Sequence, residues 1–180
     1  MMTLLSPSLQ DFTRFGYMTG WRVKEIATLE WRDIVDGTIR LRPDVSKNAE
    51  GRVLMLVGAL ATLIARRRAA RKDLMPLVFH HNGKRLTDFS KAWRRACREA
   101  GVAGKLFHDL RRTAARNMRK AGVDQRGRMQ IIGHKTQAMD CRHNIVDAED
   151  IRQGQLQTDA YLATLESVVM ALTDAQTAHT

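Results

Sequence analysis

Apolar residues return every three to four positions along most of this chain, which is the spacing of an amphipathic helix. The first such run is Leu9, Phe12 and Phe15, near one face of a segment that opens with Ser6-Pro7 and closes with Thr19-Gly20. Serine followed by proline is typical of a helix start, and glycine is typical of a helix end. The chain is therefore predicted to begin with a helix.

The same helical period recurs in six later segments. They run from Arg22 into Glu30, Gly58 to Arg71, Asp88 to Ala100, His108 to Ala121, Asp124 to Ile132, and over residues 151–180 at the C-terminal end. Thr87 is placed to cap the helix at 88–100, and Gly122 and Gly133 fall where the next two helices should end.

Strand-like runs lie between these helices. Residues 31–35 and 38–42 flank Asp36-Gly37, a pair typical of a tight hairpin turn, and a second turn at 46–52 leads into a third run at 53–57. A short strand or extended turn is also expected at 76–79. The predicted fold class is α+β, mainly helical, with a small three-stranded antiparallel sheet beside a helical bundle.

The net charge of the chain indicates which class of molecule it binds. The 180 residues include 30 lysines and arginines against 19 acidic residues, a formal net charge of +11, and the pI is near 10.5. This balance favours a polyanionic partner, the alternative being a merely soluble basic surface. The longest apolar run, 53–65, is too short to span a bilayer, and the first ten residues lack a targeting pattern. Cys97 and Cys141 lie on separate predicted elements and are expected to be small buried residues.

The candidate chemistry lies in the stretch from Phe107 to Asp150. His108 and Arg111 are one helical turn apart and are expected to point outward together, opposite an apolar stripe that starts at Leu110. His134 follows the glycine that ends the next helix. Because helix ends present oriented backbone N–H groups, this geometry suits a bound phosphate.

This stretch, together with the segment TGWRVKEIATLE near the start of the chain, resembles the tyrosine recombinases, the phage integrase family. That family carries Thr-Gly-x-Arg-x-x-Glu, a lysine in a second hairpin, His-x-x-Arg, Gly-His and a nucleophilic tyrosine within Arg-Tyr-Asn-Ile-Val. The matching positions here are Arg22 with its supporting carboxylate Glu25, then Lys47, His108, Arg111, His134 and the run Arg142-His143-Asn144-Ile145-Val146. His143 therefore stands where the family has its tyrosine.

The resemblance implies a reaction on DNA. A tyrosine oxygen attacks a phosphodiester, a 3′-phosphotyrosyl bond forms and a 5′-hydroxyl leaves, and no metal or other cofactor takes part. Arg22 and Arg111 would stabilise the transition-state charge, because a planar guanidinium matches phosphate. His108 and His134 would donate hydrogen bonds or move the nucleophile's proton, and Lys47 would protonate the leaving oxygen. Alternatively, Arg22 is a solvated helix arginine and Lys47 a surface lysine.

His143 leaves two functions open. Imidazole is a nucleophile near neutral pH, but it reaches less far than a phenol, and a misplacement of about 1 Å costs roughly 10²-fold in rate. We therefore expect His143 to disable the covalent step of a recombination domain, the alternative being a working histidine variant. The second function is a non-catalytic DNA-binding module that keeps the recombinase fold.

Double-stranded DNA is the expected partner. The candidates for contacts with its backbone are Arg94, Arg95, Arg98, Arg112 and Lys135. The basic row on the helix at 88–100 is equally compatible with an ordinary solvated face.

The resemblance also implies an organisation for the chain. Residues 1–180 would form a single catalytic domain, without the core-binding domain that precedes it in relatives. The helix at 151–180 would pack on a neighbouring subunit of a tetramer on DNA, although packing within the chain would use the same apolar stripe. A bacterial or phage-encoded protein that acts in the cytoplasm is implied.

Overall fold

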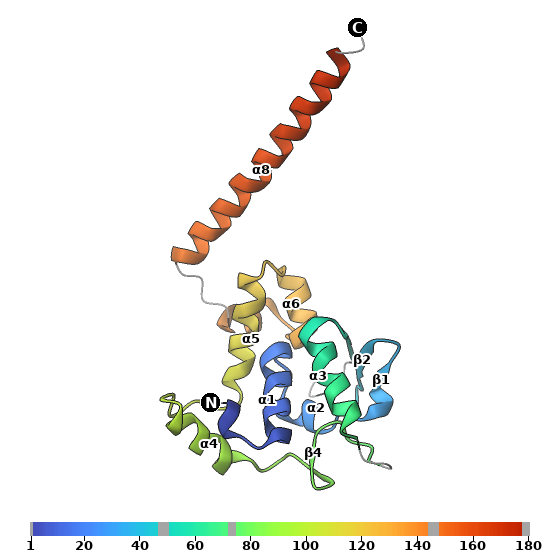
Figure 1. The fold of residues 1–180 in the computed structure, drawn as a ribbon. Helices are drawn as coiled ribbons and strands as arrows, with labels where there is room; N and C mark the ends of the chain where they lie inside the picture. Colours follow the sequence, from blue (N-terminus) through green and yellow to red (C-terminus); the bar gives the residue numbers. More distant parts are fainter. Residues whose placement is uncertain (1, 47–50, 72–74, 144–147, 178–180) are drawn as a thin grey trace. The chain divides into compact units, whose positions relative to one another are not determined.

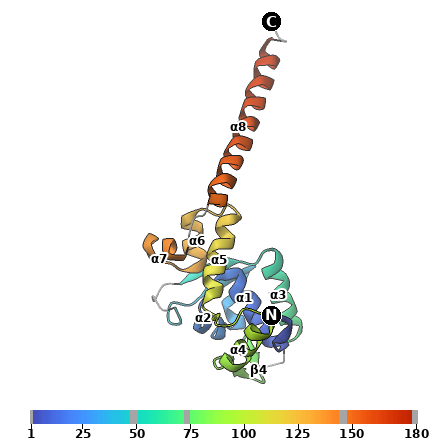
Figure 2. The ribbon, with the colours of Figure 1, turned by 90° about the vertical axis from the view of Figure 1, so that its left-hand side faces the viewer.

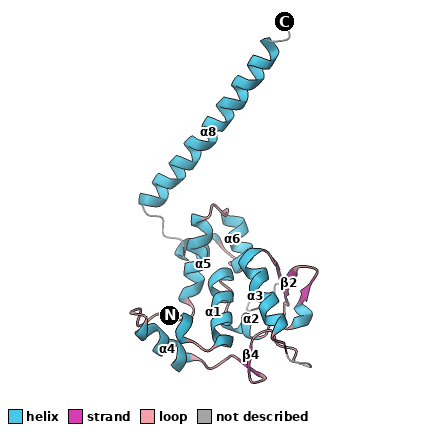
Figure 3. Cartoon of the chain, viewed as in Figure 1, coloured by secondary structure: helices cyan, strands magenta, loops and turns pink. Residues whose placement is uncertain are grey.

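The computed structural model describes residues 2–46, 51–71, 75–143 and 148–177. Within these ranges helices dominate, and strands are few (Figure 3). The helices are α1 (Pro7–Thr19), α2 (Val23–Ala27), α3 (Gly58–Ala69), α4 (Ser90–Glu99), α5 (Asp109–Lys120), α6 (Gln125–Ile132), α7 (Gln137–His143) and α8 (Ala148–Thr177), with short 3-10 turns η1 (Met2–Leu4) and η2 (Trp31–Asp33). The strands are β1 (Ile34–Val35), β2 (Thr38–Leu41), β3 (Arg52–Met55), β4 (His80–His81) and β5 (Lys84–Arg85). The predicted mainly helical α+β class is confirmed.

The three-stranded sheet has the predicted antiparallel order β1-β2-β3. Asp36 and Gly37 form the tight turn between the first two strands, and both have positive φ, 48° and 69°, as a primed hairpin turn requires. Side chains alternate along the strands, so that Ile39 and Leu54 are buried while Val53 on β3 is exposed. The small β4–β5 hairpin, in contrast, was not predicted and follows the expected extended segment at 76–79.

Within the first 143 residues, helix α1 lies between α3 and α5 (Figures 1 and 2). Its Phe12 and Phe15 are fully buried. Phe12 packs against Phe107, with ring centroids 5.3 Å apart, and both α1 rings pack against Phe79, at 5.8 and 5.3 Å. The apolar stripe recognised in the sequence therefore forms the middle of the core.

Three details of the expected secondary structure are wrong. The segment after Arg22 forms a helix of only five residues, α2, and residues 31–33 form a 3-10 turn in place of a strand. The Asp33 carboxylate accepts a hydrogen bond of 2.9 Å from the Glu30 backbone N–H, a local bond that competes with strand pairing. Helix α4 starts at Ser90, without a cap from Thr87.

The cysteine prediction is correct only in part. Cys97 is buried in α4, whereas Cys141 is exposed on α7. A cysteine behaves as a small apolar residue only where its helix face is covered. The face of α7 that carries Cys141 is not covered in the described part of the chain.

The contacts within the chain define two compact units, Met1–Asn144 and Ile145–Thr180. The organisation of residues 1–180 as a single catalytic domain stays a prediction. The second unit contains the 30-residue helix α8, as the terminal period predicted. Its apolar residues Leu156, Tyr161, Leu162 and Leu165 are exposed. The expected packing of this helix on another subunit stays a prediction. None of the described helices is both long enough and apolar enough to cross a membrane.

Gly20 tests how tightly the end of α1 is packed. It has φ +66°, and an added Cβ would lie 3.2 Å from Ala114 Cβ and 3.3 Å from Ile132 Cγ1. We expect Gly20→Ala to lower the free energy of unfolding by about 2–4 kcal/mol, through backbone strain and crowding together. Gly37→Ala is the matched control, because it has the same strain at φ +69° with nothing within 4 Å, and should cost about 1–2 kcal/mol. Equal losses in chemical denaturation would contradict the packing at Gly20.

Candidate active site

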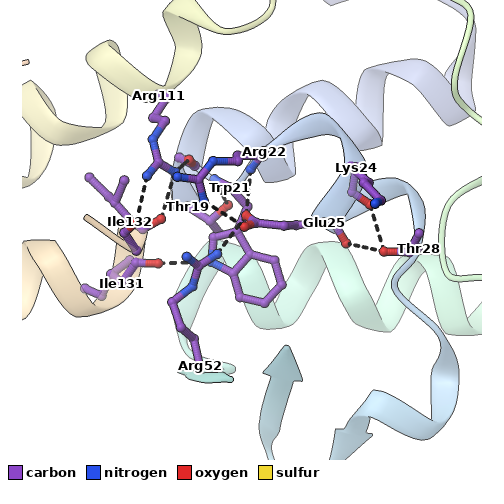
Figure 4. A network of polar contacts seen from close by, with 12 residues as sticks. Thr19, Trp21, Arg22, Lys24, Glu25, Thr28, Arg52, Arg111, Ile131 and Ile132 are labelled. Carbon is purple, nitrogen blue, oxygen red and sulfur yellow. Dashed lines mark hydrogen bonds and ion pairs between the residues drawn. The ribbon is translucent and has the colours of Figure 1, made fainter. Parts of the chain in front are cut away.

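Glu25 is the centre of the polar network at the end of α1 (Figure 4). Its side chain is 1% exposed, and it lies on the short helix α2, where Arg22 occupies the N-cap position. The Arg22 backbone N–H donates to Glu25 Oε2 at 2.9 Å, and Arg22 Nη1 donates to Oε1 at 2.9 Å. One carboxylate therefore holds both the backbone and the guanidinium of Arg22, so the alternative that Arg22 is merely a solvated helix residue is wrong.

Arg52 is a second partner of Glu25 that the sequence analysis missed. It opens β3, and its Nη2 donates to Glu25 Oε2 at 2.7 Å. Its guanidinium carbon lies 5.2 Å from the centre of the Trp21 ring, within the range of a cation–π contact. A side chain at Gly133 would overlap this guanidinium. The alternation of side chains along β3 could have identified Arg52 as a buried, paired charge. It places Arg52 on the same face as buried Leu54, where a charge needs a partner.

Arg111 is buried, so the prediction that it points outward with His108 is wrong. Arg111 Nη1 donates to the carbonyls of Gly20 and Ile132, both at 2.7 Å, and Nη2 donates to that of Gly133 at 3.1 Å. These carbonyls belong to the C-terminal ends of α1 and α6, where backbone acceptors have no partner within their own helix. The negative ends of two helix dipoles thus favour the buried guanidinium.

Burial and neighbouring charges both act on the Arg111 guanidinium. Burial, followed by the positive charge of Arg22, lowers the pKa of Arg111 to about 9, while Glu25 opposes the shift and Arg52 adds to it. Arg111 is therefore still protonated at neutral pH. Three positive groups around one carboxylate leave a local excess of positive charge, which favours a bound anion such as a phosphate.

His108 lies next to these arginines, at the N-cap position of α5. Desolvation by its surroundings, followed by the positive charges of Arg111, Arg22 and Arg112, lowers the pKa of His108, and Asp109 opposes the shift. Its side chain is nevertheless exposed. A neutral imidazole beside a phosphate site is suited to accept or donate a proton near pH 7.

His134 follows Gly133, as predicted, but its side chain is fully buried. Its Nδ1 lies 3.3 Å from Oδ1 of Asp140 on α7. Oδ2 of the same carboxylate accepts a 2.9 Å hydrogen bond from Arg128 Nη2 on α6. The sequence analysis missed both partners, and no local pattern marks them, because only the packing of α6 against α7 brings them together.

A cavity of about 530 Å³ lies between β3 and α6. It is lined by Ser46, Gly51, Arg52, Val53, Arg126, Met129, Gln130, Gly133 and His134. The structure therefore brings Arg22, Glu25, Arg111 and His108 into one cluster, with Arg52 joining that cluster to the cavity beside His134. Lys47 lies outside the described residues.

Comparison with known proteins identifies the family. Residues 4–147 match the Phage integrase family. The chain belongs to the phage integrase family. A tyrosine recombinase XerC from Roseiflexus sp. (strain RS-1) is 34% identical over 131 residues, and one from Roseiflexus castenholzii is 33% identical over 129 residues. Each match covers 66% of this chain and 41% of the relative, so the chain matches only part of the length of these relatives.

Solved structures of an integrase and of a recombinase have a similar fold. A λ integrase dimer bound to a COC′ core site has a TM-score of 0.65 at 18% identity, covering 78% of this chain and 43% of that chain. XerA recombinase has a TM-score of 0.64 at 22% identity, covering 84% and 55%. The predicted tyrosine-recombinase catalytic fold is confirmed.

His143 is the last residue of α7, and its side chain lies outside the described part of the chain. The five candidates for contacts with a DNA backbone, Arg94, Arg95 and Arg98 on α4, Arg112 on α5 and Lys135, are all exposed. The positive charge of Arg112 adds to the desolvation that lowers the pKa of His108. Contact of these side chains with DNA stays a prediction.

Replacing Arg52 tests whether it supports Glu25. We expect Arg52→Met to lower the free energy of unfolding by about 2–3 kcal/mol, because Glu25 would stay buried with one of its two guanidinium partners removed. Arg40→Met, on the exposed face of the neighbouring strand β2, is the matched control and should change it by less than about 0.5 kcal/mol. A loss in chemical denaturation no larger than that of the control would contradict the role of Arg52.

The lowered pKa of His108 predicts how the stability of the protein depends on pH. The folded protein binds the His108 proton less readily than the unfolded chain, so stability should fall as the pH drops below about 6.5. In an NMR titration, the midpoint of His108 should lie below that value and rise when inorganic phosphate is added, since an anion offsets the arginine charges. Sodium chloride at equal ionic strength is the control. An equal response to both salts would argue against a phosphate site.

Proposed function

We propose that this chain is the catalytic part of a site-specific DNA recombinase of the tyrosine recombinase type, acting on double-stranded DNA. The observation that carries the proposal is the buried carboxylate of Glu25, which organises Arg22 and Arg52 beside Arg111. A phosphodiester is the anion that such a cluster suits, because guanidiniums match the geometry of phosphate oxygens. Family membership supports the same substrate, since relatives of this fold include integrases bound to DNA.

In the proposed reaction, Arg22 and Arg111 stabilise the negative charge that develops on the phosphate in the transition state. Neutral His108 takes part in the proton transfer, His134 donates a hydrogen bond, and Lys47 protonates the leaving 5′ oxygen. Glu25 supports Arg22 without touching the substrate. Loss of one such donor typically costs about 10²–10³ in rate.

His143 occupies the position of the family's nucleophile, and we propose that it disables the covalent step. Residue 143 ends α7, and its imidazole is shorter than a phenol, so a bond to phosphorus would need a closer approach of the DNA. This histidine is also the observation that favours the second candidate, a DNA-binding module without strand cleavage. For either candidate we propose assembly of several copies on DNA in the bacterial cytoplasm, in line with a λ integrase tetramer bound to a Holliday junction.

The decisive experiment uses a nicked suicide substrate, in which a covalent protein–DNA adduct is trapped. We expect no adduct with the wild-type protein and an adduct with His143→Tyr, which supplies a phenol. His143→Phe is the matched control, because it has a ring of similar size without the hydroxyl, and should form none. The adducts are counted by denaturing gel electrophoresis.

Other outcomes distinguish the alternatives. An acid-labile adduct on the wild-type chain would show that His143 is a working nucleophile. Binding of duplex DNA by both proteins without any adduct would favour the DNA-binding module. In that case the affinity should still fall steeply with salt, since phosphate contacts dominate such binding.

A further inference from the structure

A buried polar triad links α6 to α7. It consists of Arg128 on α6, His134 after the end of α6, and Asp140 on α7. Asp140 is 0% exposed, and the side chains of Arg128 and His134 are 6% and 0% exposed. Arg128 Nη2 lies 2.9 Å from Asp140 Oδ2, and His134 Nδ1 lies 3.3 Å from Asp140 Oδ1. Both oxygens of one carboxylate therefore face a basic group.

This carboxylate ties α7 to α6. Among the described side chains of the helix, residues 137–141, Asp140 is the only buried one. A helix of seven residues has little stability of its own and depends on tertiary contacts. The apolar side chains in that range are exposed or only half-buried, so the polar contacts of Asp140 are the most deeply buried ones.

Arg128 is itself fixed by the fold. Its Nη1 donates to the backbone carbonyl of Val123 at 2.7 Å, in the turn between α5 and α6. The contacts thus form a chain that starts at this turn, passes through Arg128 to Asp140, and ends at His134. Burial alone would raise the pKa of Asp140, but hydrogen bonds from Arg128 and His134 lower it, so the group is a carboxylate at neutral pH.

We propose that Asp140 is a positioning residue that, with Arg128, orients the His134 ring and holds α7 in place, an inference that rests on the function proposed above. Because Nδ1 of His134 faces the carboxylate, a hydrogen bond from this ring to a DNA phosphate would come from Nε2, which is buried in the structure without DNA. Residue 143 follows Asp140 by three positions, about 4.5 Å along the helix axis. Asp140 therefore positions two parts of the site at once: the His134 ring and the helix that carries the nucleophile position.

The test compares Asp140→Asn with the parent, both in a His143→Tyr background. Asparagine has nearly the same shape, but it lacks the negative charge that pairs with Arg128 and His134. We expect hydrogen exchange of the α7 amides to rise at least tenfold and the single-turnover rate on the suicide substrate to fall about 10- to 100-fold, with DNA affinity changed less than about twofold. Asp159→Asn, exposed on α8, is the control and should change none of these.

An NMR titration separates positioning from general loosening. A carboxylate favours the protonated form of a neighbouring imidazole, so the midpoint of His134 should fall in Asp140→Asn and stay unchanged in Asp159→Asn. Asp140→Glu, which keeps the charge, should restore part of the rate and of the midpoint. Should Asp140→Asn fail to fold, Arg128→Lys is measured instead, and the hydrogen exchange of the α7 amides should rise while the single-turnover rate should fall.

The outcomes for this inference and for the proposed function differ. If the His143→Tyr parent forms no adduct, the proposed strand cleavage fails, while hydrogen exchange and the His134 titration still test the positioning. If the parent cleaves DNA and Asp140→Asn matches its rate, its α7 exchange and its His134 midpoint, the positioning role is overturned and the proposed function stands.

Discussion

A single carboxylate, that of Glu25, is buried between two arginines that come from different parts of the fold. Arg22 precedes α2, and Arg52 opens β3, so their shared bond to Glu25 ties the sheet to the helices. A buried carboxylate without such partners would cost several kcal/mol in lost hydration. The same charge lets both guanidiniums lie beside Arg111. The packing of the sheet, the helix and the site therefore depends on one ionised group.

Arg111 is stabilised in a different way. Carbonyl groups at the ends of α1 and α6 accept its hydrogen bonds, and these carry only partial negative charge. The guanidinium is thus held in position while most of its charge stays uncompensated. Burial, followed by the positive charge of Arg22, lowers its pKa. An arrangement of this kind keeps binding energy available for an anion, and most of all for a transition state that carries extra negative charge.

Two acidic side chains therefore organise two halves of the site. Glu25 gathers the arginines, and Asp140 faces His134 and Arg128. Asp140 and residue 143 lie on the same short helix. The basic cluster and the helix with the nucleophile position are thus each fixed by a buried ion pair, and apolar packing supplies the core around Phe12 and Phe15.

Local sequence patterns predicted much of the secondary structure of this fold. The helical period placed α1, α3, α5, α6 and α8, Asp36-Gly37 placed the first hairpin, and the motifs singled out Arg22, Glu25, His108, Arg111 and His134. Periodicity describes one helix at a time, so it could not show that α1 and α6 cover the face of α5 that carries Arg111. Arg52 lies 27 residues from Glu25, and Gly20 lies 91 residues from Arg111. Only the tertiary structure determined that Arg52 pairs with Glu25, that Arg111 bonds to Gly20, and that Asp140 faces Arg128 and His134. The partner of a buried charge depends on which polar groups the packing places next to it.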